Sequence, residues 1–87
     1  MRHITSKAFW RCYEELPSAT QRLADEKFQL LSDNPRHPAL EFMPLRSKIW
    51  RVRVGDHYRA LARKSGDIFE WFWIGSHEAY NQLIKRL

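Results

Sequence analysis

The stretch Trp50-Arg51-Val52-Arg53-Val54 alternates apolar and charged residues, and this alternation constrains the fold more than any other feature of the chain. Successive side chains of a β-strand point to opposite faces of the sheet. The alternation therefore predicts a strand with one apolar face, which must be buried against another layer. On the other face it places Arg51 and Arg53 side by side.

Two interpretations of this arginine face remain open. Tyr58-Arg59 follows on the next predicted strand, so Arg59 adds a third guanidinium group, and such a face suits the phosphates of RNA or DNA. Alternatively, the arginines pair with acidic side chains of neighbouring strands and form an ordinary solvated face. The formal net charge of +5 favours an anionic partner, either a nucleic acid or an acidic protein.

Length and composition indicate a single domain over residues 1–87 with one modest core. With 44% hydrophobic residues, the chain is expected to fold rather than remain disordered. The single cysteine, Cys12, excludes an internal disulfide, so we expect a core thiol and a cytoplasmic location. No apolar run reaches membrane-spanning length and no signal-peptide pattern opens the chain, so no membrane partner is expected.

Helical spacing of apolar residues predicts two helices near the start of the chain, after a short strand at residues 3–5. The first helix is expected to follow Ser6, which is a good N-cap residue. The second is expected to begin at Ser18, which forms a capping-box pattern with Gln21. It should end ahead of Pro35, because proline disfavours helical geometry in the residue before it.

Period-two patterns and turn residues predict four further strands, at residues 41–45, 49–54, 58–63 and 68–74. Ser76 is expected to cap a short C-terminal helix. The predicted fold class is therefore α+β, with the element order β-α-α-β-β-β-β-α.

With these elements in place, the chain resembles the RelE/ParE superfamily of bacterial type II toxins. The resemblance spans nearly the whole chain and rests on five segments in order, which are Asn34-Pro35, Pro44-Leu45, Trp50-Arg51-Val52-Arg53-Val54, Tyr58-Arg59 and Trp73-Ile74-Gly75-Ser76-His77. It implies two N-terminal helices packed on a curved antiparallel sheet, with a short C-terminal helix.

The resemblance also implies a set of catalytic positions. In the mRNA-cleaving branches, two basic residues alternate on a middle strand, an arginine follows on the next strand, and an arginine or histidine follows the last one. Arg51, Arg53, Arg59 and His77 stand at those positions, and the junction at residues 75–77 is similar to the YafQ-like branch. The implied activity is ribosome-dependent cleavage of mRNA without a metal ion or other cofactor.

Metal-free cleavage moves a ribose 2′-hydroxyl onto the adjacent phosphorus, and it needs a base, an acid and positive charge. The arginines supply charge, because arginine stays protonated. Histidine is the side chain most often used to exchange protons at physiological pH, so His77 is the candidate base or acid. Helical spacing puts Tyr80 and Asn81 on the same side as His77, where Tyr80 is a candidate to stack on a base or donate a proton and Asn81 to contact RNA.

Three further residues are weaker candidates for the site. Glu41 lies on the predicted face of Met43, the position nearest to a glutamate base of the YoeB-like branch, and is itself a candidate base. His57 lies in a turn beside Arg59 and is a candidate substrate contact, although turn residues are more often simply solvated. Lys48 is also a candidate substrate contact. No His or Cys pair has zinc-site spacing.

Other function classes remain open. ParE-like members of the superfamily inhibit DNA gyrase without cleaving RNA, and the shared fold does not separate the two branches. A domain that only binds nucleic acid is a third class. This class does not explain why a histidine, His77, stands between the last predicted strand and the C-terminal helix. Either toxin interpretation implies a cognate antitoxin protein as partner. The nuclease interpretation adds mRNA on the ribosome.

Overall fold

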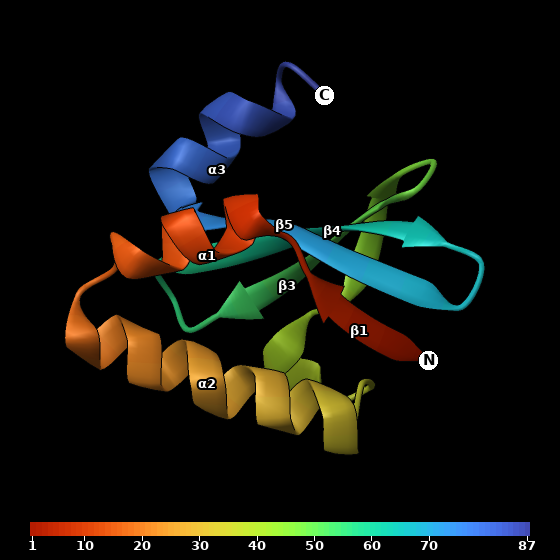
Figure 1. The fold of residues 1–87 in the computed structure, drawn as a ribbon, viewed down its shortest axis with the longest axis horizontal. Coiled ribbons are helices and arrows are strands. Elements are labelled where there is room, and N and C mark those ends of the chain that lie inside the picture. The colour runs from red at the N-terminus through yellow and green to blue at the C-terminus, as the bar shows by residue number, and fades with distance from the viewer.

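A five-stranded open sheet carries the helices in the computed structural model, which describes residues 1–87 (Figure 1). The strands are β1 (Arg2–Thr5), β2 (Met43–Arg46), β3 (Ile49–Val54), β4 (Tyr58–Ser65) and β5 (Ile68–Ser76). The helices are α1 (Lys7–Glu14), α2 (Ser18–Asp33) and α3 (His77–Ile84), and a 3₁₀ turn, η1 (Pro38–Leu40), precedes β2. The predicted α+β fold and the predicted order of helices and strands are confirmed.

The sheet is mixed, with the strand order β1-β5-β4-β3-β2. Strands β2 to β5 pair antiparallel, but β1 runs parallel to β5, with His3 beside Phe69. The expectation of a wholly antiparallel sheet is therefore wrong at this edge. Two helices and three strands separate β1 from β5, so no hairpin turn fixes their relative direction.

Serine side chains determine where two of the three helices begin. Ser6 and Ser76 each accept a hydrogen bond from the backbone N–H three residues further on, at 3.2 and 3.1 Å. Helix α2 instead follows Pro17 without a side-chain cap, so the predicted capping box is wrong. The Gln21 amide donates to the carbonyl of Tyr13 at 2.9 Å and thereby ties α2 to α1. No helix of the structure has the length and apolar character needed to cross a bilayer.

The main core lies between α1, α2 and one face of the sheet. Val52 and Val54 are buried there, which confirms the predicted alternation of β3 and turns the arginines to the opposite face. Cys12 is half-buried against this core. The complete cluster of buried residues is Phe9, Ala24, Leu31, Leu40, Val52, Val54, Ala60, Ala62, Phe69, Trp71 and Ile74.

Helix α3 lies on the other side of the sheet from α2 (Figure 1). Leu61 and Tyr80 are buried but do not belong to the main core, and Leu61 stands opposite Arg51 in the β3–β4 ladder. These two side chains are therefore buried outside the main core, Leu61 on β4 and Tyr80 on α3. At the far end of the helix, Arg46 of β2 donates to the carbonyl of Ile84 at 2.7 Å.

Candidate active site

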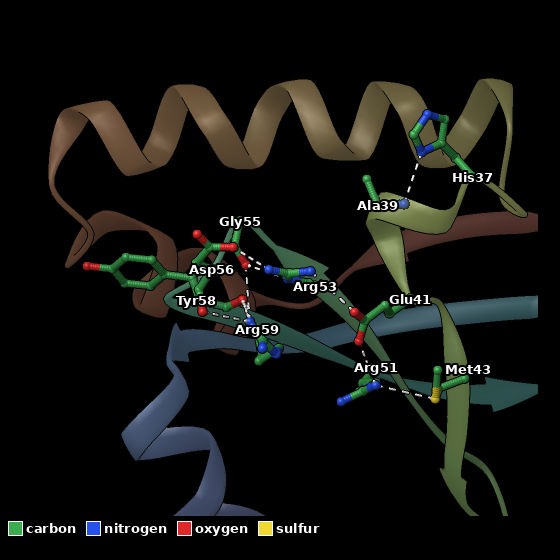
Figure 2. Close-up of polar contacts among 10 residues, drawn as sticks. All are labelled: His37, Ala39, Glu41, Met43, Arg51, Arg53, Gly55, Asp56, Tyr58 and Arg59. Carbon is green, nitrogen blue, oxygen red and sulfur yellow. Dashed lines mark hydrogen bonds and ion pairs between the residues drawn. The ribbon is translucent and has the colours of Figure 1, made fainter.

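The sheet face turned away from α2 brings Arg51, Arg53 and Arg59 together (Figure 2). Arg53 is directly opposite Arg59 in the β3–β4 ladder, and Arg51 lies two residues along the same strand. Residues two apart on a strand share a face, so the three guanidinium groups belong to one surface. We call this surface the arginine face.

Arg59 is held by the turn between β3 and β4. Its side chain is nearly buried, with 9% of the residue exposed. Nη1 donates to the carbonyl oxygens of Tyr58 at 2.8 Å, Gly55 at 3.1 Å and Asp56 at 3.4 Å. Burial, and then the like charges of Arg53 and Arg51, lower the pKa of Arg59. The Arg59 guanidinium group is thus held in place and largely desolvated.

Carboxylates already occupy part of the arginine face. Glu41 Oε1 lies 3.0 Å from Arg51 Nη2, and Glu41 Oε2 lies 3.3 Å from Arg53 Nη1 (Figure 2). Asp56 pairs with the other terminal nitrogen of Arg53. Three arginines and two carboxylates leave the face a formal charge of +1. The second interpretation of the sequence therefore describes this surface, although the acids come from loops and not from neighbouring strands.

Glu41 reaches the arginines from an unexpected backbone position. The strand predicted at 41–45 begins only at Met43, because Glu41 ends η1 in the left-handed conformation with a φ of 44°. Leu40 beside it is fully buried and anchors the turn. Glu41 thus reaches the surface expected from the period-two pattern, but from a turn and not from a strand. Asp56 was missed, although its position in the hairpin turn three residues after Arg53 is a usable signal.

His77 lies at the first position of α3 and is exposed. Its ring stacks on that of Tyr80, with centroids 6.0 Å apart and an interplanar angle of 25°. Its backbone N–H donates to the carbonyl of His57 at 2.8 Å. Both histidines line an open pocket of about 280 Å³ whose walls are Asp56, His57, Tyr58, Ser76, His77 and Glu78. No arginine lines this pocket, so the histidines border the arginine face at its hairpin end.

Tyr80 lies between these two groups. It is 3% exposed, and its phenol is close enough to Arg59 to act electrostatically on that guanidinium. A ring so deeply buried is not free to stack on an RNA base, so the expectation of stacking by Tyr80 is not supported. Its ring stacks on the imidazole of His77 and lies near the guanidinium group of Arg59.

The remaining candidates are less closely tied to the arginines. Asn81 is half-buried on α3 and its side chain makes no hydrogen bond within the chain. Lys48 lies in the turn that precedes β3, at the end of that strand opposite to Arg53. It lines a separate basic pocket with Arg46 and Lys64. The structure thus brings Arg51, Arg53, Arg59 and Glu41 together and separates Lys48 from them.

The site combines a fixed cation, two paired cations and two groups that can move protons. Glu41 contacts the face through Arg51 and Arg53, and His77 adjoins it through Tyr80 and the hairpin turn. Such a set can bind an anion and stabilise negative charge that develops on it. The protein therefore belongs to the class of small basic α+β domains. It has an open, mixed sheet with helices on both sides, and one face of the sheet carries the three arginines.

Comparison with known proteins identifies this class. A family model described as the ParE-like toxin domain matches residues 18–82. Because the match covers more than half of the chain, the chain belongs to this family of toxins, within the RelE/ParE superfamily. The predicted superfamily is confirmed, and with it the general character of a toxin domain. No protein of curated function matches the sequence.

Solved structures show the same fold at low sequence identity. The archaeal RelE of a RelE–RelB complex from Pyrococcus horikoshii OT3 is 20% identical, with a TM-score of 0.68 over 86% of this chain and 92% of that chain. YafQ from E. coli strain BL21(DE3) is 15% identical, with a TM-score of 0.72 over 92% and 98%. A YoeB/ParE toxin from Agrobacterium tumefaciens is 18% identical, with a TM-score of 0.66 over 88% and 99%.

Proposed function

We propose that the protein is the toxin of a toxin–antitoxin pair and acts as a ribosome-dependent mRNA endonuclease. The observation that carries this proposal is the clustering of Arg51, Arg53 and Arg59 on one sheet face, with Arg59 fixed by three backbone carbonyls. Attack of a ribose 2′-hydroxyl creates a crowded, negatively charged phosphorane. Fixed cations stabilise that charge with little reorganisation when the reaction occurs.

Each group has a proposed role in the reaction. Arg51 and Arg53 bind the phosphate, and Arg59 stabilises the charge that develops on it. His77 serves as base or acid, because an imidazole can both accept and donate a proton through its ring nitrogens and this one is open to solvent. Glu41 is a further group that can accept a proton, and its carboxylate contacts both Arg51 and Arg53. His57 and Asn81 border the bound RNA.

Inhibition of DNA gyrase is the second candidate function. The family match carries the ParE-like description, and the arginine face has a formal charge of only +1 once Glu41 and Asp56 are counted. A gyrase inhibitor needs a complementary surface and no acid–base pair. The two functions therefore differ in their dependence on His77.

An antitoxin is the proposed protein partner. Two of the similar solved structures are RelE–RelB complexes, from Pyrococcus horikoshii and Methanococcus jannaschii. We expect an acidic or amphipathic antitoxin segment to cover the arginine face or a sheet edge. β1 forms one edge of the sheet, next to a cleft of about 370 Å³ between β1, α1 and α2.

The proposal is tested with purified protein on translating ribosomes, with mRNA cleavage mapped by primer extension, beside a gyrase supercoiling assay. We expect cleavage of ribosome-bound mRNA and unchanged supercoiling. Inhibited supercoiling with intact mRNA would favour the ParE-like function. Growth arrest on expression should be relieved by co-expression of an antitoxin encoded next to this protein.

A further inference from the structure

Glu41 occupies the position on the arginine face where a phosphate is expected to bind. Its two carboxylate oxygens approach two different guanidinium groups, Oε1 that of Arg51 at 3.0 Å and Oε2 that of Arg53 at 3.3 Å. A phosphodiester group also offers two anionic oxygens on one central atom, and it prefers the same charge-assisted hydrogen bonds. One anion at a time can use this pair of terminal nitrogens.

The carboxylate is held in a way that permits exchange. The Glu41 side chain is 38% exposed, whereas Arg51 and Arg53 are 19% and 30% exposed. The arginines are thus the more enclosed partners, and the carboxylate can turn into water. The backbone need not follow, because Leu40 fixes the turn in the core. Partly exposed ion pairs are weak enough to be replaced by another anion.

We propose that Glu41 is an internal anion, which fills the phosphate subsite of Arg51 and Arg53 in the free protein and is displaced by a phosphodiester group when RNA binds. This inference rests on the proposed function for the identity of its ligand. It reconciles the two interpretations of the arginine face, since the arginines pair with an acid in the free protein and with a phosphate in the complex.

The exchange sets a free-energy threshold that an isolated anion meets less easily than an oligonucleotide does. A single anion must replace two ion pairs of Glu41 and gains only similar contacts in return. An oligonucleotide brings further phosphates and bases, whose contacts add to the exchange. Glu41 therefore lowers the affinity of the site for every anion, and its removal should raise the affinity for small anions as well as for RNA.

The test is a titration of the protein with inorganic phosphate, followed by NMR of the arginine Nε–H groups, and with a short single-stranded RNA, followed by fluorescence anisotropy. Glu41→Gln removes the charge and keeps the size of the side chain. Glu26→Gln on α2 is the control, because it changes the net charge equally at an exposed residue outside the ion pairs of the arginine face.

We expect Glu41→Gln to bind both ligands about 2- to 30-fold more tightly, the range for loss of two partly exposed ion pairs. Glu26→Gln should match the parent within twofold. The RNA affinity of Glu41→Gln should also fall more steeply with salt, by about 0.7 in the logarithmic slope. Unchanged or weaker binding by Glu41→Gln would overturn the proposal and assign Glu41 to positioning of the arginines.

Failure of this inference can be distinguished from failure of the proposed function, because the titrations need neither ribosomes nor cleavage. A protein that cuts no mRNA but gains anion affinity on Glu41→Gln retains the inference. Cleavage by the parent with no gain in affinity overturns it. A variant that gains affinity but cleaves 100-fold more slowly supports the exchange and shows in addition that cleavage needs the Glu41 carboxylate.

Discussion

Arg53 and Arg59, directly opposed on neighbouring strands, donate hydrogen bonds to the same acceptor, the carbonyl oxygen of Gly55, at 3.2 and 3.1 Å. Like charges directly opposite each other normally destabilise a pair of strands. Here the shared carbonyl and the carboxylate of Asp56 offset the repulsion. The turn between β3 and β4 therefore supports the arginine face directly.

Substitution of Gly55 should disturb this arrangement. Its φ of +69° is strained for other residues, and an added Cβ would lie 2.7 Å from Leu23 Cδ2. We expect Gly55→Ala to lower the free energy of unfolding by roughly 1–3 kcal/mol, measured by urea denaturation. Gly66→Ala is the control, because its φ is +61° and a Cβ there meets nothing within 4 Å. Equal costs would show that the contact with Leu23 is unimportant.

Removal of two arginines should weaken RNA binding without unfolding the protein. In Arg51→Ala/Arg53→Ala the phosphate that the two arginines bind together is lost, so the logarithmic salt slope of RNA binding should become shallower by about 0.7. Folding should persist, because Glu41 is partly exposed and can be hydrated. Arg11→Ala/Arg22→Ala removes the same charge from exposed helix positions and should keep the slope. An unchanged slope in the first variant would place phosphate binding elsewhere.

Loss of the His77 imidazole separates the nuclease from the gyrase inhibitor. His77→Ala should slow mRNA cleavage by roughly two to four powers of ten, the usual contribution of a general acid or base. Stability and antitoxin binding should change little, because the side chain is exposed and Ser76 provides the cap of α3. His77→Gln keeps a hydrogen-bonding group and should be equally impaired. Full toxicity of His77→Ala would favour gyrase inhibition.

The stability of the fold should depend on pH through His3. Burial, and then the amino group of Met1, lower the pKa of His3, and its Nδ1 accepts the indole N–H of Trp71 at 3.0 Å. In the unfolded chain this pKa is about 6.5. The unfolded chain therefore binds a proton first as the pH falls below about 6.5. The contribution of His3 to the free energy of unfolding is therefore complete above about pH 6.5. It decreases as the pH falls from there to the lowered pKa of the folded protein.

Urea denaturation at pH 7.5 and pH 5.5 checks this expectation. The parent should be less stable at the lower pH. His3→Gln retains an acceptor for the indole but has no titrating group, so its stability should differ less between the two conditions. The same difference in both proteins would assign the pH dependence to other groups.

Local patterns predicted the centre of the sheet well. The alternation of β3 was reliable because a shift of one residue would bury Arg51 and Arg53 and expose Val52 and Val54. The turn at Gly55 was equally predictable, since a turn position with the left-handed backbone conformation favours glycine. These features depend on neighbours in sequence, and a single sequence contains that information.

Contacts between distant segments were harder to predict. The parallel pairing of β1 with β5 joins residues more than 60 positions apart, and no turn sets its direction. The pairing of Glu41 with Arg51 and Arg53 depends on a left-handed backbone after η1, which no period-two pattern contains. The burial of Tyr80 depends on how α3 lies over β4. Tertiary packing determines all three.

Helix α3 is attached to the sheet at both of its ends. At its start, α3 follows β5 without a loop and is capped by Ser76. At its end, the side chain of Arg46 donates to the carbonyls of Ile84 and Leu87, and Arg46 lies on β2, three strands from β5 in the sheet. The mechanical consequence is that α3 has no free end about which to pivot. We therefore expect α3 to keep its place beside the arginine face, so that access to the arginines depends on rotation of side chains and not on a helical lid.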